Sequence, residues 1–73
     1  MFEKVKQLLV DELQIDAGSI TMESELSKDL NINSIELADL VMMCEDKFGI
    51  EISEDAANEF VTVGDVVNYL ENL

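Results

Sequence analysis

The chain has 73 residues, which make one small domain (1–73) whose core yields only about 3–5 kcal/mol of net stability. Its 17 Asp and Glu residues against four Lys, without Arg or His, give a net charge of −13, which excludes nucleic acid and anionic membranes as partners and favours basic protein surfaces. The single cysteine excludes an intrachain disulfide. No leader segment or membrane-spanning run is visible in the sequence. We therefore expect a cytoplasmic protein.

Residues 2 to about 15 are predicted to form the first helix. Apolar residues recur there at three- and four-residue steps: Phe2, Val5, Leu8, Leu9 and Leu13. Asp16-Ala17-Gly18-Ser19 is expected to end this helix.

Residues 16–33 are predicted to form a long connection, a length that is uncommon in compact domains unless side chains hold the loop in place. The apolar side chains available for this are Ile20, Leu26, Leu30 and Ile32. Thr21 or Ser24 can begin a short turn within the connection.

Residues 34–48 are predicted to form the second helix, which Gly49 ends. Its apolar stripe is too wide for an ordinary amphipathic helix, so part of it should be exposed. Met42 is the methionine we expect at the surface, and Cys44 should be a small buried apolar residue.

The start of this second helix is the most informative stretch. Asn33 is a good N-cap, and Glu36 can complete a capping box with it. The hydroxyl of Ser34 is then not needed as a cap, and it lies where the free N–H groups and partial positive charge of a helix favour a phosphate. The sequence therefore predicts a serine that can carry a phosphodiester.

The last third of the chain contains two further helix starts. Ile50-Glu51-Ile52 alternates like a short strand, and Ser53 then caps a short third helix that runs to about Glu59. Thr62 caps a fourth helix with Asp65 as its capping-box partner. The inward face of that helix consists of Val63, Val66, Val67 and Leu70. The predicted fold is all-α, a four-helix bundle with a short third helix and a long loop between helices 1 and 2.

No catalytic constellation is present, because the chain has no His and offers no base beside its one thiol. Asp29-Leu30-Asn31-Ile32-Asn33 matches the first five places of an EF-hand loop, but Ser34, Glu36 and Leu40 then occupy positions that require Gly, an apolar residue and Glu. We therefore predict neither an enzyme nor a dedicated metal site, although clustered carboxylates can bind calcium or magnesium loosely.

The chain resembles the acyl carrier proteins over nearly its whole length. The similar segments are Leu26-Ser27-Lys28-Asp29-Leu30, Asn33-Ser34-Ile35, Glu36 to Met42, Phe48-Gly49-Ile50-Glu51-Ile52, Phe60 to Val67 and Tyr69-Leu70. Members of this family carry 4′-phosphopantetheine on the serine of an Asp-Ser-Leu motif. Asn33 and Ile35 depart from that motif. We expect this departure to affect recognition by the phosphopantetheinyl transferase.

The resemblance implies that Ser34 carries 4′-phosphopantetheine and that acyl groups are held as thioesters on this arm for fatty acid or related biosynthesis. It implies contacts with the phosphopantetheinyl transferase and with acyl-transferring enzymes that have basic surfaces, through Asn33, Ile35, Glu36, Ala38, Asp39, Met42, Glu45, Asp46 and Ile52. It also implies a pocket for the acyl chain among Leu26, Leu30, Cys44, Ala57 and Phe60. The carrier is expected to be a monomer.

Three alternatives stay open at this point. One is an aminoacyl or peptidyl carrier of a specialised pathway, and another is an unmodified acidic protein-binding module. The third is a calcium-binding protein. Transfer of the cofactor separates carriers from the unmodified module, and calcium titration tests the third alternative.

Overall fold

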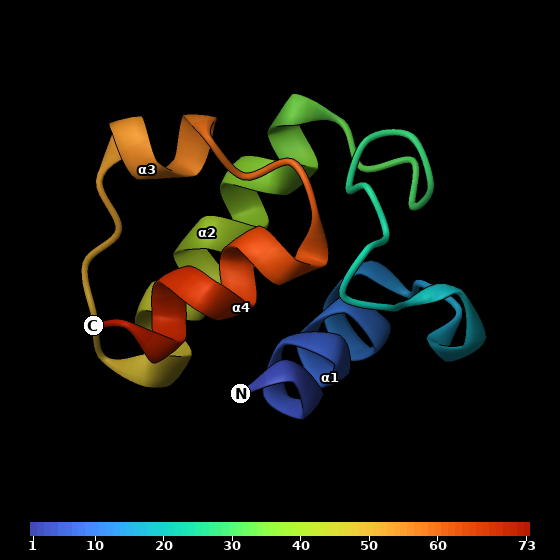
Figure 1. Ribbon diagram of the computed structural model, residues 1–73, viewed down its shortest axis with the longest axis horizontal. Coiled ribbons are helices and arrows are strands. Elements are labelled where there is room, and N and C mark those ends of the chain that lie inside the picture. The colour runs from blue at the N-terminus through green and yellow to red at the C-terminus, as the bar shows by residue number, and fades with distance from the viewer.

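Four α-helices and one 3₁₀ helix make up the regular structure of the chain. The computed structural model describes residues 1–73. The elements in chain order are α1 (Phe2–Leu13), η1 (Ala17–Ser19), α2 (Ser34–Phe48), α3 (Glu54–Asn58) and α4 (Val63–Glu71) (Figure 1). The predicted all-α fold, with a short third helix and a long loop between the first two main helices, is confirmed.

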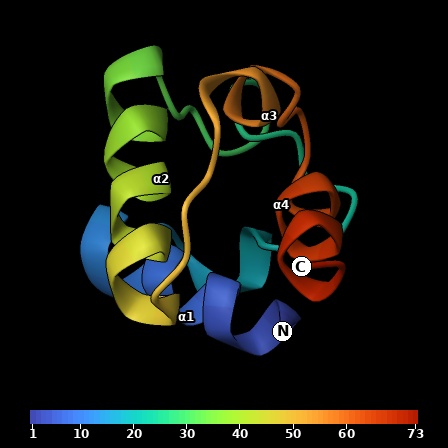
Figure 2. The same ribbon diagram turned by 90° about the vertical axis from the view of Figure 1, so that its left-hand side faces the viewer.

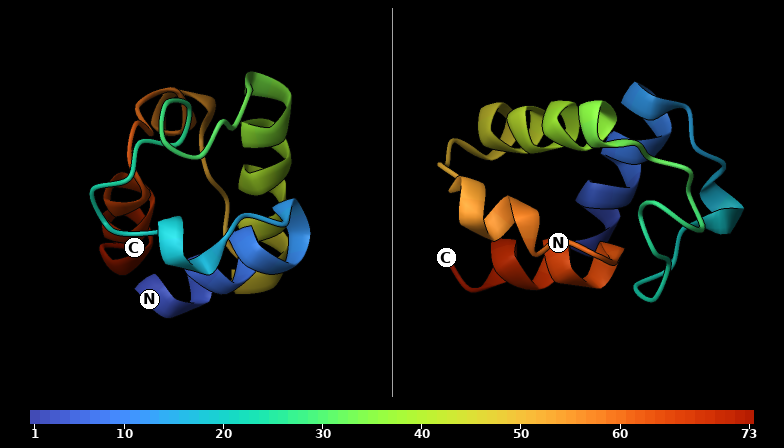
Figure 3. Two further views of the ribbon diagram at one scale, coloured as in Figure 1. Left: turned by 90° about the vertical axis from the view of Figure 1, so that its right-hand side faces the viewer. Right: turned by 90° about the horizontal axis from the view of Figure 1, so that it is seen from above.

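The helices surround a single apolar core. Seen from one end, α2 and α4 form opposite sides, α1 crosses below and α3 crosses above (Figure 2). In the view from above, α2 and α4 again lie on opposite sides of the molecule (Figure 3, right). The long loop lies at the end of the molecule opposite the C-terminus. None of the helices combines the length and the apolar character needed to span a membrane.

The core receives side chains from every main helix except α3, and from the long loop. The predicted inward face of α4 is fully confirmed, since Val63, Val66, Val67 and Leu70 are all buried. Val5, Leu8 and Leu9 are the buried residues of α1. Cys44 is buried on α2 as predicted.

The long loop is fixed in place by its own apolar side chains, as predicted. The four expected residues, Ile20, Leu26, Leu30 and Ile32, are all buried in the core. Ser24 forms the predicted turn, because its N–H donates to the Thr21 carbonyl and its hydroxyl accepts from the Thr21 N–H. Burial therefore stabilises a segment that has almost no regular structure.

Backbone hydrogen bonds also join the loop to the start of α4. The Leu26 N–H donates to the Val61 carbonyl at 2.8 Å, and the Gly64 N–H donates to the Met22 carbonyl at 2.8 Å. A Cβ at Gly64 would lie only 2.8 Å from that Met22 oxygen, so the close approach requires glycine. This junction fixes Leu26 relative to the segment that carries Phe60.

Two local features differ from the pattern of the sequence. The first helix ends earlier than expected, at Leu13, because Gln14 adopts a left-handed conformation (φ 56°) that closes the helix; Ala17–Ser19 then forms η1. Ile50–Ile52 is not a strand, because its N–H groups bond to Glu45 rather than to a partner strand. The only β-type pairing in the chain is an isolated bridge between Glu25 and Thr62.

Candidate functional site

The N-terminus of α2 is closed by the capping box that the sequence predicts. The Glu36 N–H donates to Asn33 Oδ1 at 2.8 Å, and the Asn33 N–H donates to Glu36 Oε1 at 3.2 Å. Both side chains are thus used in fixing the direction in which the helix begins.

Ser34 is the first residue of α2, and its side chain is exposed. Its hydroxyl takes part in none of the side-chain hydrogen bonds of the protein, since Asn33 provides the cap. The N–H groups of Ser34 and Ile35 precede the first helical hydrogen bond, so they point outward without a backbone partner. The hydroxyl is therefore free to react, next to groups that favour a negative charge.

A hollow of about 210 Å³ lies directly beside this serine. Its walls consist of Leu26, Ser27, Ile32, Asn33, Ser34, Leu37 and Phe60. Leu26 and Phe60 belong to the acyl pocket that the resemblance implies, whereas Ile32 and Leu37 are lining residues outside that implied set. The sequence pattern indicates only that Ile32 helps to hold the loop, and Leu37 lies inside the similar segment Glu36 to Met42 without a role of its own.

The other three residues of the predicted acyl pocket do not line this hollow. Leu30 and Cys44 are buried in the core, and Ala57 is half-buried on α3 beside it. Burial raises the pKa of the Cys44 thiol to about 11, and the neighbouring charge of Glu45 adds to the effect. Cys44 is therefore an inert apolar group under neutral conditions.

The outer face of α2 is apolar and acidic. Ile35 is 74% exposed and Met42 is 60% exposed, although both are large apolar side chains. Ala38, Asp39 and Asp46 are exposed on the same helix. The exposure predicted for Met42 is confirmed, and the apolar surface lies among carboxylates rather than lysines.

Two of the residues predicted to contact partners, Glu45 and Ile52, are not exposed as Ile35 and Met42 are. Ile52 is only 8% exposed and belongs to the core, so little of its side chain is available to a partner. The carboxylate of Glu45 accepts the Ile52 N–H at 2.8 Å. Glu45 therefore supports the connection between α2 and α3, and it is only partly available to a partner.

No group of three or more His, Cys, Asp or Glu side chains converges in a way that could hold a metal ion. The EF-hand-like stretch uses its oxygens for folding instead. Asp29 Oδ2 accepts the Glu25 N–H at 2.8 Å, and Asn33 Oδ1 caps α2.

A small four-helix fold that presents an exposed serine hydroxyl, without a hydrogen bond, at the start of a long helix is the arrangement expected of a carrier domain. The comparisons with known proteins agree. Residues 3–70 match the family described as "Phosphopantetheine attachment site". The chain is 42% identical over 72 residues to the acyl carrier protein of Helicobacter acinonychis (strain Sheeba), and 40% identical to that of Helicobacter pylori (strain G27). Each match covers 99% of this chain and 92% of the relative. The chain belongs to the acyl carrier protein family.

Family membership establishes the general role. The chain carries 4′-phosphopantetheine covalently on a serine and holds acyl groups on this arm for fatty acid biosynthesis. It is a carrier and not an enzyme. It interacts with holo-acyl-carrier-protein synthase, which attaches the arm, and with the enzymes of fatty acid synthesis.

Proposed function

We propose that Ser34 is the residue that carries the phosphopantetheine, and that the outer face of α2 presents the loaded arm to each partner enzyme in turn. The observation that carries the proposal is the exposed hydroxyl of Ser34, which has no hydrogen bond within the protein and stands at the N-terminus of a 15-residue helix.

The other serines of the chain are less suitable. Of the five serines, Ser19, Ser24 and Ser53 each use the hydroxyl in a hydrogen bond. Ser27 is exposed and lines the same hollow as Ser34, but it lies within the loop and not at a helix start. Ser27 is therefore the matched control for any test of Ser34.

The residues around Ser34 fit a phosphodiester. The free N–H groups of Ser34 and Ile35 and the positive end of the helix dipole favour its negative charge. The arm supplies a terminal thiol that binds the acyl group as a thioester. The protein contributes a fixed attachment point, because the capping box of Asn33 and Glu36 holds the start of α2.

The surface that meets the partner enzymes is the outer face of α2, with Asn33, Ile35, Glu36, Ala38, Asp39, Met42 and Asp46. Ile35 and Met42 supply the small apolar centre, and the carboxylates around them attract lysine and arginine side chains. Charge pairing of this kind sets the encounter rate and the choice of partner, and it permits release. The net charge of −13 also keeps two copies apart, which favours a monomer.

The apolar hollow beside Ser34 is the place where the acyl chain begins to enter the protein. Leu26 and Phe60 form its walls together with Ile32 and Leu37. Deeper entry would bring the chain toward Leu30, Cys44 and Ala57, the remaining residues of the predicted pocket. If carriers loaded with acyl chains of different lengths give the same chemical shifts at these positions, the chain does not enter there.

The test is an intact mass measurement after incubation with coenzyme A and a phosphopantetheinyl transferase. We expect the wild type and Ser27→Ala to gain the mass of one phosphopantetheine, and Ser34→Ala to gain nothing. Loading of Ser34→Ala, or loss of loading in Ser27→Ala, would contradict the assignment. If the wild type is not loaded but the Asn33→Asp variant is, the departure from the family motif limits recognition by the transferase, and the serine itself is able to carry the arm.

A further inference from the structure

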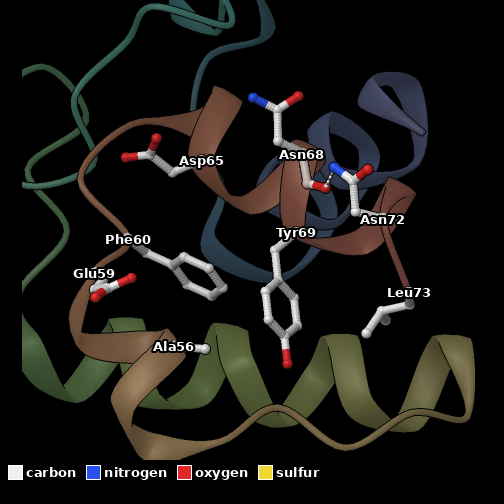
Figure 4. Close-up of a pocket in the computed structure, with 8 residues that line it drawn as sticks. All are labelled: Ala56, Glu59, Phe60, Asp65, Asn68, Tyr69, Asn72 and Leu73. Carbon is white, nitrogen blue, oxygen red and sulfur yellow. Dashed lines mark hydrogen bonds between the residues drawn. The ribbon is translucent and has the colours of Figure 1, made fainter.

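A second and larger hollow lies between α3 and α4, away from the exposed face of α2. Its volume is about 380 Å³ (Figure 4). The residues that matter for its chemistry are Glu59, Phe60, Asp65, Asn68, Tyr69 and Asn72. None of them was assigned to a site except Phe60, so the hollow has no role in the function described above.

Two of the residues that line this hollow, Phe60 and Tyr69, form an aromatic pair. The rings of Phe60 and Tyr69 meet edge to face, with centroids 5.6 Å apart and planes at 71°. Figure 4 shows both rings side by side in the space between the helices, with Glu59 and Asp65 on the Phe60 side. The faces of aromatic rings carry partial negative charge and attract cations.

The rim of the hollow is acidic and has unused acceptor oxygens. Asp65 Oδ2 accepts the N–H groups of Val61 and Thr62, both at 3.0 Å, which fixes the carboxylate in place and leaves Oδ1 without a partner. These hydrogen bonds also lower the pKa of Asp65, so it remains charged at neutral pH. The side chain of Glu59 is exposed, and its carboxylate forms no hydrogen bond or ion pair within the protein.

No positive charge of the protein balances this rim. Of the four hollows on the surface, two contain Lys4 or Lys47 beside their acids, and the hollow at Ser34 has no charged wall. The hollow between α3 and α4 is the only one with acidic residues and no lysine. Its lining therefore complements a cation from outside the protein.

We propose that the hollow between α3 and α4 is a docking site for an arginine side chain of a partner protein. The planar guanidinium group can lie against the Phe60–Tyr69 pair while its N–H groups donate to Glu59 and to Asp65 Oδ1. A lysine ammonium would gain the same charge attraction but could neither stack on the rings nor donate in a planar fork. The occupant we commit to is thus arginine and not lysine.

This site is separate from the outer face of α2, and the proposal does not depend on the modification of Ser34. The two regions still share one side chain, because Phe60 lines both the hollow at Ser34 and the hollow between α3 and α4. An arginine that displaces the Phe60 ring would alter the wall beside the attachment serine. A partner that docks here would therefore sense, or change, the space available to the acyl chain.

The test is an NMR titration of the complete, unmodified chain with N-acetyl-arginine amide, with N-acetyl-lysine amide as the comparison at equal ionic strength. Tyr69 is the only tyrosine of the chain, so its ring signals report on the hollow without overlap from another tyrosine. We expect the arginine probe to shift the Tyr69 ring and the amides of Glu59 to Asn72 at lower concentration than the lysine probe. A stacked guanidinium predicts about a two- to fivefold difference in Kd.

Two variants separate this site from general attraction to an acidic protein. Glu59→Gln removes a rim charge, and Glu51→Gln removes another exposed carboxylate, which does not line the hollow. We expect Glu59→Gln to weaken the arginine probe at least about twofold and Glu51→Gln to leave it unchanged. Equal effects of the two variants, equal Kd values for arginine and lysine, or shifts spread over all acidic residues would each overturn the proposal.

Discussion

Cys44 illustrates how burial controls the reactivity of a single side chain. Cys44 is 1% exposed, and the raised pKa of its thiol, about 11, leaves about one thiolate in a thousand molecules at pH 8. An unfolded cysteine, with a pKa near 8.5, is roughly one quarter ionised at that pH. Reaction with an alkylating reagent should therefore be hundreds of times slower in the folded protein.

The measurement is iodoacetamide labelling at pH 8, followed by intact mass, with and without 6 M urea. We expect labelling of the unmodified protein only in urea. After loading with phosphopantetheine, one label should appear in the native protein, on the thiol of the arm. Rapid native labelling of the unmodified chain would contradict the buried position of Cys44.

Ile35 and Met42 show the opposite situation, since they are apolar side chains that the fold does not bury. Ile35→Ala and Met42→Ala should each change the free energy of unfolding by less than about 0.5 kcal/mol, because little contact is lost. If the outer face of α2 meets the enzymes, both variants should raise the KM of the transferase. Val61→Ala is the matched control, because Val61 is 53% exposed but lies outside α2. If Ile35→Ala and Met42→Ala change the KM no more than Val61→Ala does, the outer face of α2 is not the docking face.

The individual site residues were only partly predictable from the sequence. The position of Ser34 after a capping asparagine follows from local hydrogen bonding, which depends on residues three positions apart. The Ile52 side chain is buried in the core, and its N–H donates to the carboxylate of Glu45, seven residues earlier. Periodicity within α2 cannot reveal which carboxylate a later loop will use, so Glu45 and Ile52 were both assigned to the partner surface.

The start of α4 depends on Asp65, and its hydrogen bonds make that dependence sensitive to pH. The pKa of Asp65 is lowered by the bonds from the Thr62 and Val61 N–H groups. A carboxyl group with a lower pKa in the folded state stabilises the protein above its unfolded pKa, near 3.9, and loses this contribution as pH falls through the folded value. Asp65→Asn should thus be less stable than the wild type at pH 7.

The measurement is urea unfolding of both proteins between pH 7 and pH 3. We expect the difference in free energy of unfolding between wild type and Asp65→Asn to be constant from pH 7 to about pH 5 and to shrink below the unfolded pKa. Taking the difference removes the effect of all other carboxylates. A difference that stays constant down to pH 3 would show that Asp65 contributes through packing rather than charge.

The helices themselves were largely predictable because each main helix after the first begins with a side-chain cap. Asn33, Ser53 and Thr62 each accept an N–H three residues later, as the sequence indicates. The end of α1 was less certain, because the chain turns there at Gln14, a residue type that seldom adopts positive φ. Ile50 and Ile52 alternate as in a short strand, but a strand needs a neighbouring strand, and the only β-type pairing is the isolated bridge between Glu25 and Thr62.

The whole molecule carries a charge that its own contacts do not neutralise. None of the four lysines forms an ion pair, and the one ion pair of the structure joins the N-terminal amine to Glu71 at 3.9 Å. With a net charge of −13 on a domain whose radius of gyration is 10.8 Å, repulsion lowers the free energy of unfolding at pH 7. Counter-ions in solution should therefore stabilise the fold.

We expect the Tm of the protein to rise when magnesium or calcium is added at millimolar concentration, and to rise more than in NaCl of the same ionic strength. Relief of about 1 kcal/mol of repulsion corresponds to a rise of about 4–8 °C for a domain of this size. Because no cluster of carboxylates converges on a metal site, the two ions should act almost equally and without saturating at one equivalent. Thermal unfolding followed by circular dichroism measures this. A rise in Tm that saturates at one equivalent of calcium would instead reveal a specific calcium site. An unchanged Tm would show that the surface charges are too far apart for their repulsion to lower the stability.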